Sequence, residues 1–147
     1  SVNSVSELQK YLNMAIADAD VLIMAAAVSD FKPKVVIQNK LKKINKKEIN
    51  IKLELTKDIL QEINGNFVKI GFAAETEKII NEAQKKLTNK NLDLIIANDI
   101  TRKDSGFSTE TNKVWIINKN KEITELPTLT KFEVANKILD QAKPLLG

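Results

Sequence analysis

The chain has 147 residues, of which 43% are hydrophobic and 29% are charged, a balance typical of one globular domain with a single core. It contains neither cysteine nor histidine, which excludes disulfides, thiolate metal sites and every catalytic arrangement that needs an imidazole. The net charge of +4 comes almost entirely from lysine, which suits point-charge contact with a polyphosphate better than sequence-specific contact with nucleic acid.

The first 33 residues predict a helix followed by a buried strand. Ser4 and Glu7 form the signature of a capping box, and apolar residues then recur at helical spacing. The run VLIMAAAV at 21–28 has no polar position and is typical of a central strand in a parallel sheet. Pro33 prevents regular continuation of that strand.

A lysine-rich stretch covers residues 32–57. Its centre, 39–47, has too few apolar residues to pack, and we interpret it as a mobile flap or an exposed hairpin. Apolar residues alternate with polar ones between 49 and 55, which predicts a half-buried strand. Thr56 is placed to cap a short helix that ends near residue 63.

The second half of the chain alternates between strand-like and helix-like segments. Thr130 and Glu133 form a second capping box, which begins the last helix. The other expected elements are strands at 67–72 and 92–97, a helix that ends near residue 90 between them, a loop at 101–112, and a hairpin made of 114–117 and 123–126.

This order of elements predicts a single-domain α/β fold. We expect a Rossmann-like three-layer sheet, mostly parallel, with a carboxy-terminal β-hairpin and a lysine-rich flap. Sheets of this kind bind their ligands at the carboxyl ends of the strands. The loops after Ala26, Phe72 and Ala97 are therefore the expected binding site.

Five motifs occur in order along nearly the whole chain: AAAVSDFKP at 25–33, NKLKK at 39–43, TKDIL at 56–60, IGFAAET at 70–76 and KNLDLIIAND at 90–99. Together they resemble the phosphopantothenate–cysteine ligases, the synthetase domain of the bifunctional coenzyme A biosynthesis flavoproteins. The resemblance implies activation of 4′-phosphopantothenate with CTP to an acyl-cytidylate, followed by amide formation with cysteine.

The resemblance also implies the partners of the enzyme. We expect Mg²⁺ with the nucleotide, FMN only where a decarboxylase domain is fused upstream, and a homodimer with residues 27–34 near the subunit boundary. The family begins with a glycine-rich strand and turn and an asparagine that stabilises the acyl-nucleotide, and no counterpart precedes Ser1. Residues 1–147 are therefore expected to form a synthetase domain whose active site is incomplete by itself.

Several residues receive site roles through the resemblance. Lys40 is expected to be catalytic, because a lysine in a flap can neutralise charge that develops on the phosphates. The other expected nucleotide contacts are Met24, Ala25, Ala26, Asp30, Lys57, Asp58, Ile59, Leu60, Phe72, Lys86 and Lys90. The residue pattern alone allows plainer roles: a turn for Asp30, core packing for Phe72, and the helix dipole for Lys86 and Lys90.

Two alternative functions fit the sequence less well. A dinucleotide-binding oxidoreductase would carry Gly-x-Gly-x-x-Gly after a strand, and this chain does not. A basic nucleic-acid-binding module would use residues 32–57, but that stretch has no arginine or aromatic residue. We expect small-molecule substrates, with no nucleic acid or membrane as partner, and the absence of cysteine, of a signal peptide and of a long apolar run suggests the cytoplasm.

Overall fold

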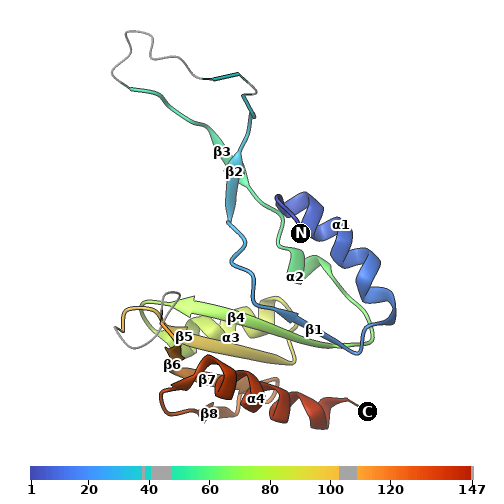
Figure 1. Ribbon diagram of the computed structural model, residues 1–147, viewed down its shortest axis with the longest axis vertical. Coiled ribbons are helices and arrows are strands. Elements are labelled where there is room, and N and C mark those ends of the chain that lie inside the picture. The colour runs from blue at the N-terminus through green and yellow to red at the C-terminus, as the bar shows by residue number, and fades with distance from the viewer. Residues whose placement is uncertain (38, 41–47, 103–108, 147) are drawn as a thin grey trace.

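A computed structural model describes residues 1–37, 39–40, 48–102 and 109–146. Within these residues, five strands form one sheet with helices on both faces (Figure 1). In spatial order the strands are β1 (Val21–Met24), β4 (Val68–Glu75), β5 (Leu94–Asp99), β7 (Val114–Asn118) and β8 (Ile123–Glu125). The predicted α/β class is confirmed.

The sheet is mixed rather than mostly parallel. β1, β4 and β5 run parallel to one another, whereas β7 is antiparallel to both β5 and β8. β7 and β8 form the predicted hairpin, and a short turn of this kind can join only antiparallel strands. In that turn Lys121 has a φ of 64° and its N–H donates to the carbonyl of Asn118 at 2.9 Å.

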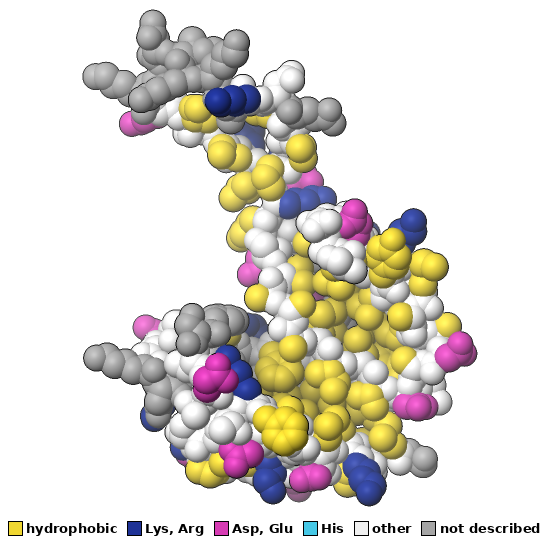
Figure 2. Space-filling view, in the orientation of Figure 1, with side chains coloured by type: hydrophobic (Ala, Val, Ile, Leu, Met, Phe, Trp, Pro, Cys, Tyr) yellow, Lys and Arg dark blue, Asp and Glu magenta, His cyan; other side chains and the backbone are white. Residues whose placement is uncertain are grey.

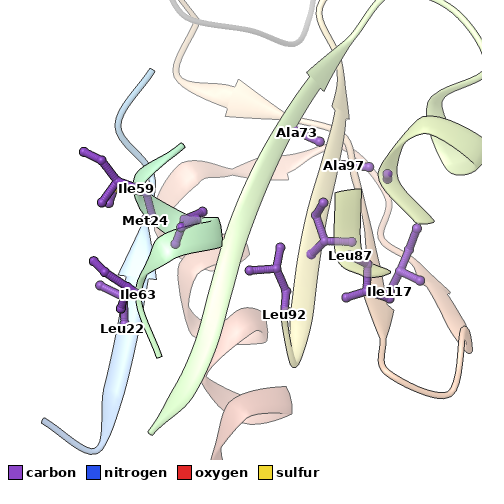
Figure 3. Close-up of a cluster of buried hydrophobic side chains, with 12 residues drawn as sticks. Leu22, Met24, Ile59, Ile63, Ala73, Leu87, Leu92, Ala97 and Ile117 are labelled. Carbon is purple, nitrogen blue, oxygen red and sulfur yellow. The ribbon is translucent and has the colours of Figure 1, made fainter. Parts of the chain in front are cut away.

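Helices cover the two faces of the sheet unequally. On one face, α1 (Val5–Ala15), α2 (Ile59–Glu62) and α3 (Ile79–Asn89) enclose a first cluster of buried side chains from alternate strand positions, including Ala73 and Ala97 (Figure 3). On the other face, α4 (Lys131–Ala142) packs against a second cluster. Helices on both faces of the sheet make three layers, as predicted.

The remaining elements are short. The 3₁₀ helices η1 (Ile16–Asp18) and η2 (Lys143–Leu145) follow α1 and α4, and β6 (Thr111–Asn112) pairs with β9 (Leu129–Thr130) beside the start of α4. In the part of the chain that the structure describes, no helix combines the length and the apolar character needed to cross a bilayer.

β1 is a short edge strand, so the prediction of a buried central strand over 21–28 is wrong. Only Val21–Met24 form the strand, and among the described residues it pairs with β4 alone. Leu22 and Met24 are buried against the first cluster, whereas Ile23 is 42% exposed. An apolar run indicates what a strand can bury, but its neighbours in the sheet decide which faces are covered.

A narrow arm, of which the structure describes residues 31–37, 39–40 and 48–55, projects from the body of the molecule (Figure 1). β2 (Phe31–Pro33) pairs with the antiparallel strand β3 (Leu53–Leu55), in agreement with an exposed hairpin. The prediction of a half-buried strand between 49 and 55 is wrong, because its four apolar residues are all exposed: Ile49, Ile51, Leu53 and Leu55. Of the predicted centre of the flap, 39–47, residues 41–47 lie outside the described residues.

The helix starts agree only in part with the sequence. At α4 the capping box is complete, since Thr130 Oγ1 accepts the N–H of Glu133 at 3.2 Å and the Glu133 carboxylate accepts the N–H of Thr130 at 2.9 Å. At α2 the cap is Asp58 rather than Thr56. The N–H of Thr56 donates to the carbonyl of Asp30 at 2.8 Å, and the Thr56 hydroxyl oxygen is buried without a hydrogen-bond partner among the described residues.

Candidate functional site

A cavity of about 560 Å³ opens at the carboxyl ends of β1, β4 and β5. Its walls come from the chain that leaves β1, from the segment between β3 and α2, and from the inner sides of α3 and α4. This is the edge of the sheet where the carboxyl-end rule places a ligand.

All of the expected nucleotide contacts except Lys40 line this cavity: Met24, Ala25, Ala26, Asp30, Lys57, Asp58, Ile59, Leu60, Phe72, Lys86 and Lys90. The fold thus brings together residues that are up to 66 positions apart in the sequence (24 to 90). Lys40 is exposed on the arm and is not among the described residues that line the cavity.

Lys86 and Lys90 are both held by carboxylates at the cavity wall. Lys86 Nζ lies 2.6 Å from Glu75 Oε1 at the end of β4, and Lys90 Nζ lies 2.8 Å from Asp58 Oδ2 at the start of α2. The Glu75 side chain is largely buried, so its charge is poorly screened by water. Each ammonium group is therefore fixed at the cavity by a partner on another element.

A side-chain carboxylate caps the start of α2. Asp58 Oδ1 accepts the N–H of Gln61 at 3.2 Å, and the helix is a single turn long. A carboxylate therefore occupies this terminus, and the positive groups beside it are side chains, Lys57 and Lys90.

The loop before the arm has a turn that does not use Asp30. The hydroxyl of Ser29 donates to the carbonyl of Phe31 at 2.8 Å, so Ser29 makes the local bond that was an alternative role for Asp30. The backbone carbonyl of Asp30 accepts the N–H of Thr56, and Asp30 lines the cavity. The Asp30 carboxylate is therefore not needed for this turn.

Phe72 lies at the cavity rather than in the core. Phe72 is 37% exposed and lines the cavity, so it is not a core residue, which was its alternative role. The preceding residue, Gly71, lets helix and loop side chains approach β4 closely, since a Cβ at Gly71 would lie 2.8 Å from Leu92 Cδ1. A side chain at 71 would require the Leu92 side chain to shift.

Sequence reasoning missed several polar residues of this site, among them Glu75, Asn98, Asn112 and Lys131. Glu75 holds Lys86, and the other three line the cavity. Asn98 carries the only usable signal, a polar residue directly after the buried run LIIA at 94–97. Asn112 and Lys131 reach the cavity through the β6–β9 pairing, which no local pattern reveals.

Comparison with known proteins places the chain in a family. The DNA/pantothenate metabolism flavoprotein C-terminal domain matches residues 1–145. The chain belongs to this family. Members named coenzyme A biosynthesis bifunctional protein CoaBC are similar to it: that of Bacillus subtilis is 38% identical over 147 residues, 98% of this chain and 36% of that protein. That of Borreliella burgdorferi is 46% identical over 125 residues, 82% of this chain and 31% of that protein.

A solved member of this flavoprotein family has the same fold. The crystal structure of the C-terminal domain of the coenzyme A biosynthesis bifunctional protein CoaBC matches with a TM-score of 0.77 and 36% identity, over 99% of this chain and 64% of that one. The chain spans about a third of the length of the two curated relatives. The family and the fold are thereby established.

Proposed function

We propose that the chain carries the synthetase step of coenzyme A biosynthesis, as a CTP-dependent phosphopantothenate–cysteine ligase acting in the cytoplasm. The observation that carries this proposal is the single cavity at the carboxyl edge of the sheet, into which four of the five motifs place residues. Family membership and the name of the CoaBC relatives support the same reaction.

The reaction has two steps with different electrostatic demands. The carboxylate of 4′-phosphopantothenate attacks the α-phosphorus of CTP and expels pyrophosphate, which leaves an acyl-cytidylate. The amine of cysteine then attacks the acyl carbon, and CMP departs as the amide forms. The first step brings an anion to a polyanion, so fixed positive charge at the phosphates is the main catalytic requirement.

Lys86 and Lys90 are placed to meet that requirement. Their ammonium groups are already oriented by Glu75 and Asp58, so binding a triphosphate costs little reorganisation of these side chains. Each lysine has three donors, and a single carboxylate contact leaves others for phosphate oxygens. Phe72 and the backbone after β1 supply the neighbouring wall for the nucleoside.

Mg²⁺ fits this site only together with the nucleotide. The described residues contain no group of three or more side chains able to hold a metal ion. Mg²⁺ with nucleotides commonly takes one or two carboxylates and completes its shell with phosphates and water. Asp30 at the cavity would be the protein ligand, and the ion would reduce the negative charge on the triphosphate. FMN would belong to a fused decarboxylase domain.

The arm supports a homodimer. In its strand register Phe31 faces Leu55 and Pro33 faces Leu53, so these four side chains share one face, whereas Lys32 pairs with Glu54 at 3.4 Å on the other. Phe31 is 54% and Leu55 is 73% exposed, and Figure 2 shows hydrophobic side chains along the arm. A second copy of this chain would cover this apolar face.

The same arm carries Lys40 away from the cavity of its own chain. In the proposed dimer Lys40 therefore serves the cavity of the partner, where it neutralises charge on the phosphates. This arrangement keeps the catalytic role that the motif at 39–43 implies and accounts for its position on the arm.

Product formation tests the proposed function. The full-length protein, rather than residues 1–147 alone, is incubated with CTP, Mg²⁺, 4′-phosphopantothenate and cysteine, and pyrophosphate and phosphopantothenoylcysteine are measured together. We expect equal amounts of both, and no amide when CTP or cysteine is omitted. Saturable, salt-sensitive binding to random oligonucleotides without any amide product would instead support the nucleic-acid alternative.

A further inference from the structure

Thr56, at the wall of the cavity, carries a buried hydroxyl group without a partner. Its Oγ1 atom exposes less than 1 Å² of surface and makes no hydrogen bond, and among the described residues it is the only buried side-chain oxygen or nitrogen in this condition. Such an oxygen is unfavourable relative to a methyl group in the same place. Folding alone would therefore be served better by valine, which has the same shape.

The backbone of Thr56 belongs to the base of the arm. Its N–H donates to the carbonyl of Asp30 at 2.8 Å, directly after the paired residues of the β2–β3 hairpin. Thr56 and Asp30 both line the cavity. Because this hydrogen bond fixes the backbone, rotation of the side chain is the motion that remains at Thr56.

Charged residues that line the cavity flank Thr56 on both sides. Asp30 is its backbone partner, and Lys57 follows it in the chain. The next residue, Asp58, holds Lys90 Nζ at 2.8 Å. In the proposed function Asp30 meets Mg²⁺ and the lysines meet the phosphates, so a magnesium triphosphate that spans these groups passes Thr56. A hydroxyl group in this place is a donor for an anionic oxygen.

A change of rotamer would bring the hydroxyl to such a ligand. Thr56 is half-buried as a residue while its Oγ1 is covered, so another part of the residue is the part exposed now. The Cα–Cβ bond has three staggered positions, and a turn of about 120° moves Oγ1 to the place of the methyl group. The turn replaces an unpaired buried oxygen by a methyl group, and an acceptor in the cavity would favour the turned form.

From this arrangement we infer that Thr56 is a nucleotide-binding residue whose hydroxyl donates to a phosphate oxygen of the triphosphate. The inference rests on the proposed function and extends it, because it adds an uncharged donor beside Lys57 and Lys90. Thr56 contributes to affinity for the nucleotide and not to affinity for the acyl substrate.

Calorimetric titration of the full-length protein with CTP tests this assignment. Thr56→Val keeps the shape and removes the hydroxyl, so the affinity should fall roughly tenfold, while Thr56→Ser keeps the hydroxyl and should stay within about twofold of the wild type. The melting temperature of the valine variant should be unchanged or higher, because an unpaired buried hydroxyl is removed. Thr124→Val makes the same change on the exposed strand β8, outside the cavity lining, and should leave the affinity unchanged.

Nucleotide analogues show which part of the nucleotide the hydroxyl meets. CTP, 2′-deoxy-CTP and UTP share the triphosphate and differ in the ribose or the base, so each should bind Thr56→Val roughly tenfold more weakly than it binds the wild type. A ratio near one for 2′-deoxy-CTP or for UTP would mean that the hydroxyl contacts the ribose 2′-hydroxyl or the base, and it would overturn the assignment to the phosphates.

Other outcomes would also overturn the assignment. Unchanged CTP affinity with a raised KM for 4′-phosphopantothenate would mean that Thr56 contacts the acyl substrate. A valine variant that melts at a lower temperature or does not fold would show a structural hydroxyl, and a tenfold loss in the serine variant would show that the methyl group matters instead. If the wild type binds no CTP, the proposed function itself fails and this inference with it, whereas an active wild type with an unaffected valine variant rejects the inference alone.

Discussion

Asp58 uses its two carboxylate oxygens for two different elements: Oδ1 accepts the N–H of Gln61 and caps α2, while Oδ2 lies 2.8 Å from Nζ of Lys90 at the end of α3. One turn earlier on α3, Lys86 is held in the same way by Glu75 of β4. The positions of the two lysines thus depend on the mutual packing of three elements.

We expect Lys86→Ala and Lys90→Ala each to weaken CTP binding about tenfold, since each removes one point charge at the phosphates. For Lys90→Ala the free energy of unfolding should fall by less than about 1 kcal/mol, because this ion pair is partly exposed, whereas Lys86→Ala should cost more, because it leaves the largely buried Glu75 carboxylate unpaired. Calorimetric titration with CTP measures the affinity. Lys85→Ala is the control on the same helix, where Lys85 pairs with Glu82 away from the cavity. Equal affinities for the Lys85 and Lys86 variants would contradict the role.

Replacement of Lys40 should affect turnover more than binding. We expect Lys40→Ala to lower kcat roughly 10²-fold or more while CTP affinity changes little, because the charge acts on the developing transition state. Lys52→Ala serves as the control, since Lys52 is an exposed lysine on the same arm. Similar small decreases of kcat in both variants would show that Lys40 has no catalytic role and is an ordinary surface lysine.

Mixing of inactive variants shows which chain Lys40 serves. If Lys40 acts in the partner's cavity, Lys40→Ala protein mixed with a Lys86→Ala/Lys90→Ala protein should regain about a quarter of wild-type activity, because half of the dimers are mixed and each contains one complete site. If Lys40 acts within its own chain, every site in the mixture lacks one group and no activity returns.

The apolar face of the arm predicts the effect of a charge on assembly. We expect Leu55→Asp to convert the dimer to a monomer in sedimentation velocity, since the carboxylate would be buried without a partner at the interface. Glu54→Gln, on the opposite face of the same strand, should leave the dimer intact. A dimer of unchanged stability in the Leu55 variant would place the interface elsewhere.

Lys69 predicts a pH dependence of stability. Burial lowers the pKa of the Lys69 amino group, with the nearby Asp93 opposing this effect. As pH rises through the lowered pKa toward the ordinary value of 10.5, the folded state has lost a proton that the unfolded chain still binds, so wild-type stability gains in this window. The Lys69→Met variant has no titrating amino group at this position, so its free energy of unfolding should not increase in this pH window.

The Met variant should also be less stable at neutral pH by about 2–3 kcal/mol, because Lys69 Nζ donates to the carbonyls of Leu60 and Ile63, both at 2.9 Å, and these would lose their donor. Urea unfolding of both proteins at neutral pH and at alkaline pH below 10.5 measures the difference. A difference that shrinks as pH rises would contradict the assignment of the shifted pKa to Lys69.

Short-range features of this fold could be predicted from the sequence. The Thr130–Glu133 capping box and the β7–β8 hairpin each depend on residues within a few positions of one another. Thr56 was predicted to cap α2, whereas Asp58, two residues later, caps it. The exact start of a short helix is therefore not visible in a local pattern.

Features that depend on neighbouring strands were harder to predict. The apolar run after Asp20 was compatible with a central or an edge strand, because the run does not specify how many partners the strand has. Burial of Asn98 requires β4, β7 and α4 to close around the end of β5. The motif residues converge on one cavity, but the length of the arm separates Lys40 from it.

The arm links association to catalysis, since one segment carries both the apolar face that a partner would cover and the lysine that the partner's cavity would use. Specific activity should therefore fall on dilution, and it should do so at the concentration where the dimer dissociates. A small molecule or peptide that covers Phe31 and Leu55 would act as an inhibitor at a site that no substrate occupies. Its effect would be relieved by raising the enzyme concentration and not by raising CTP.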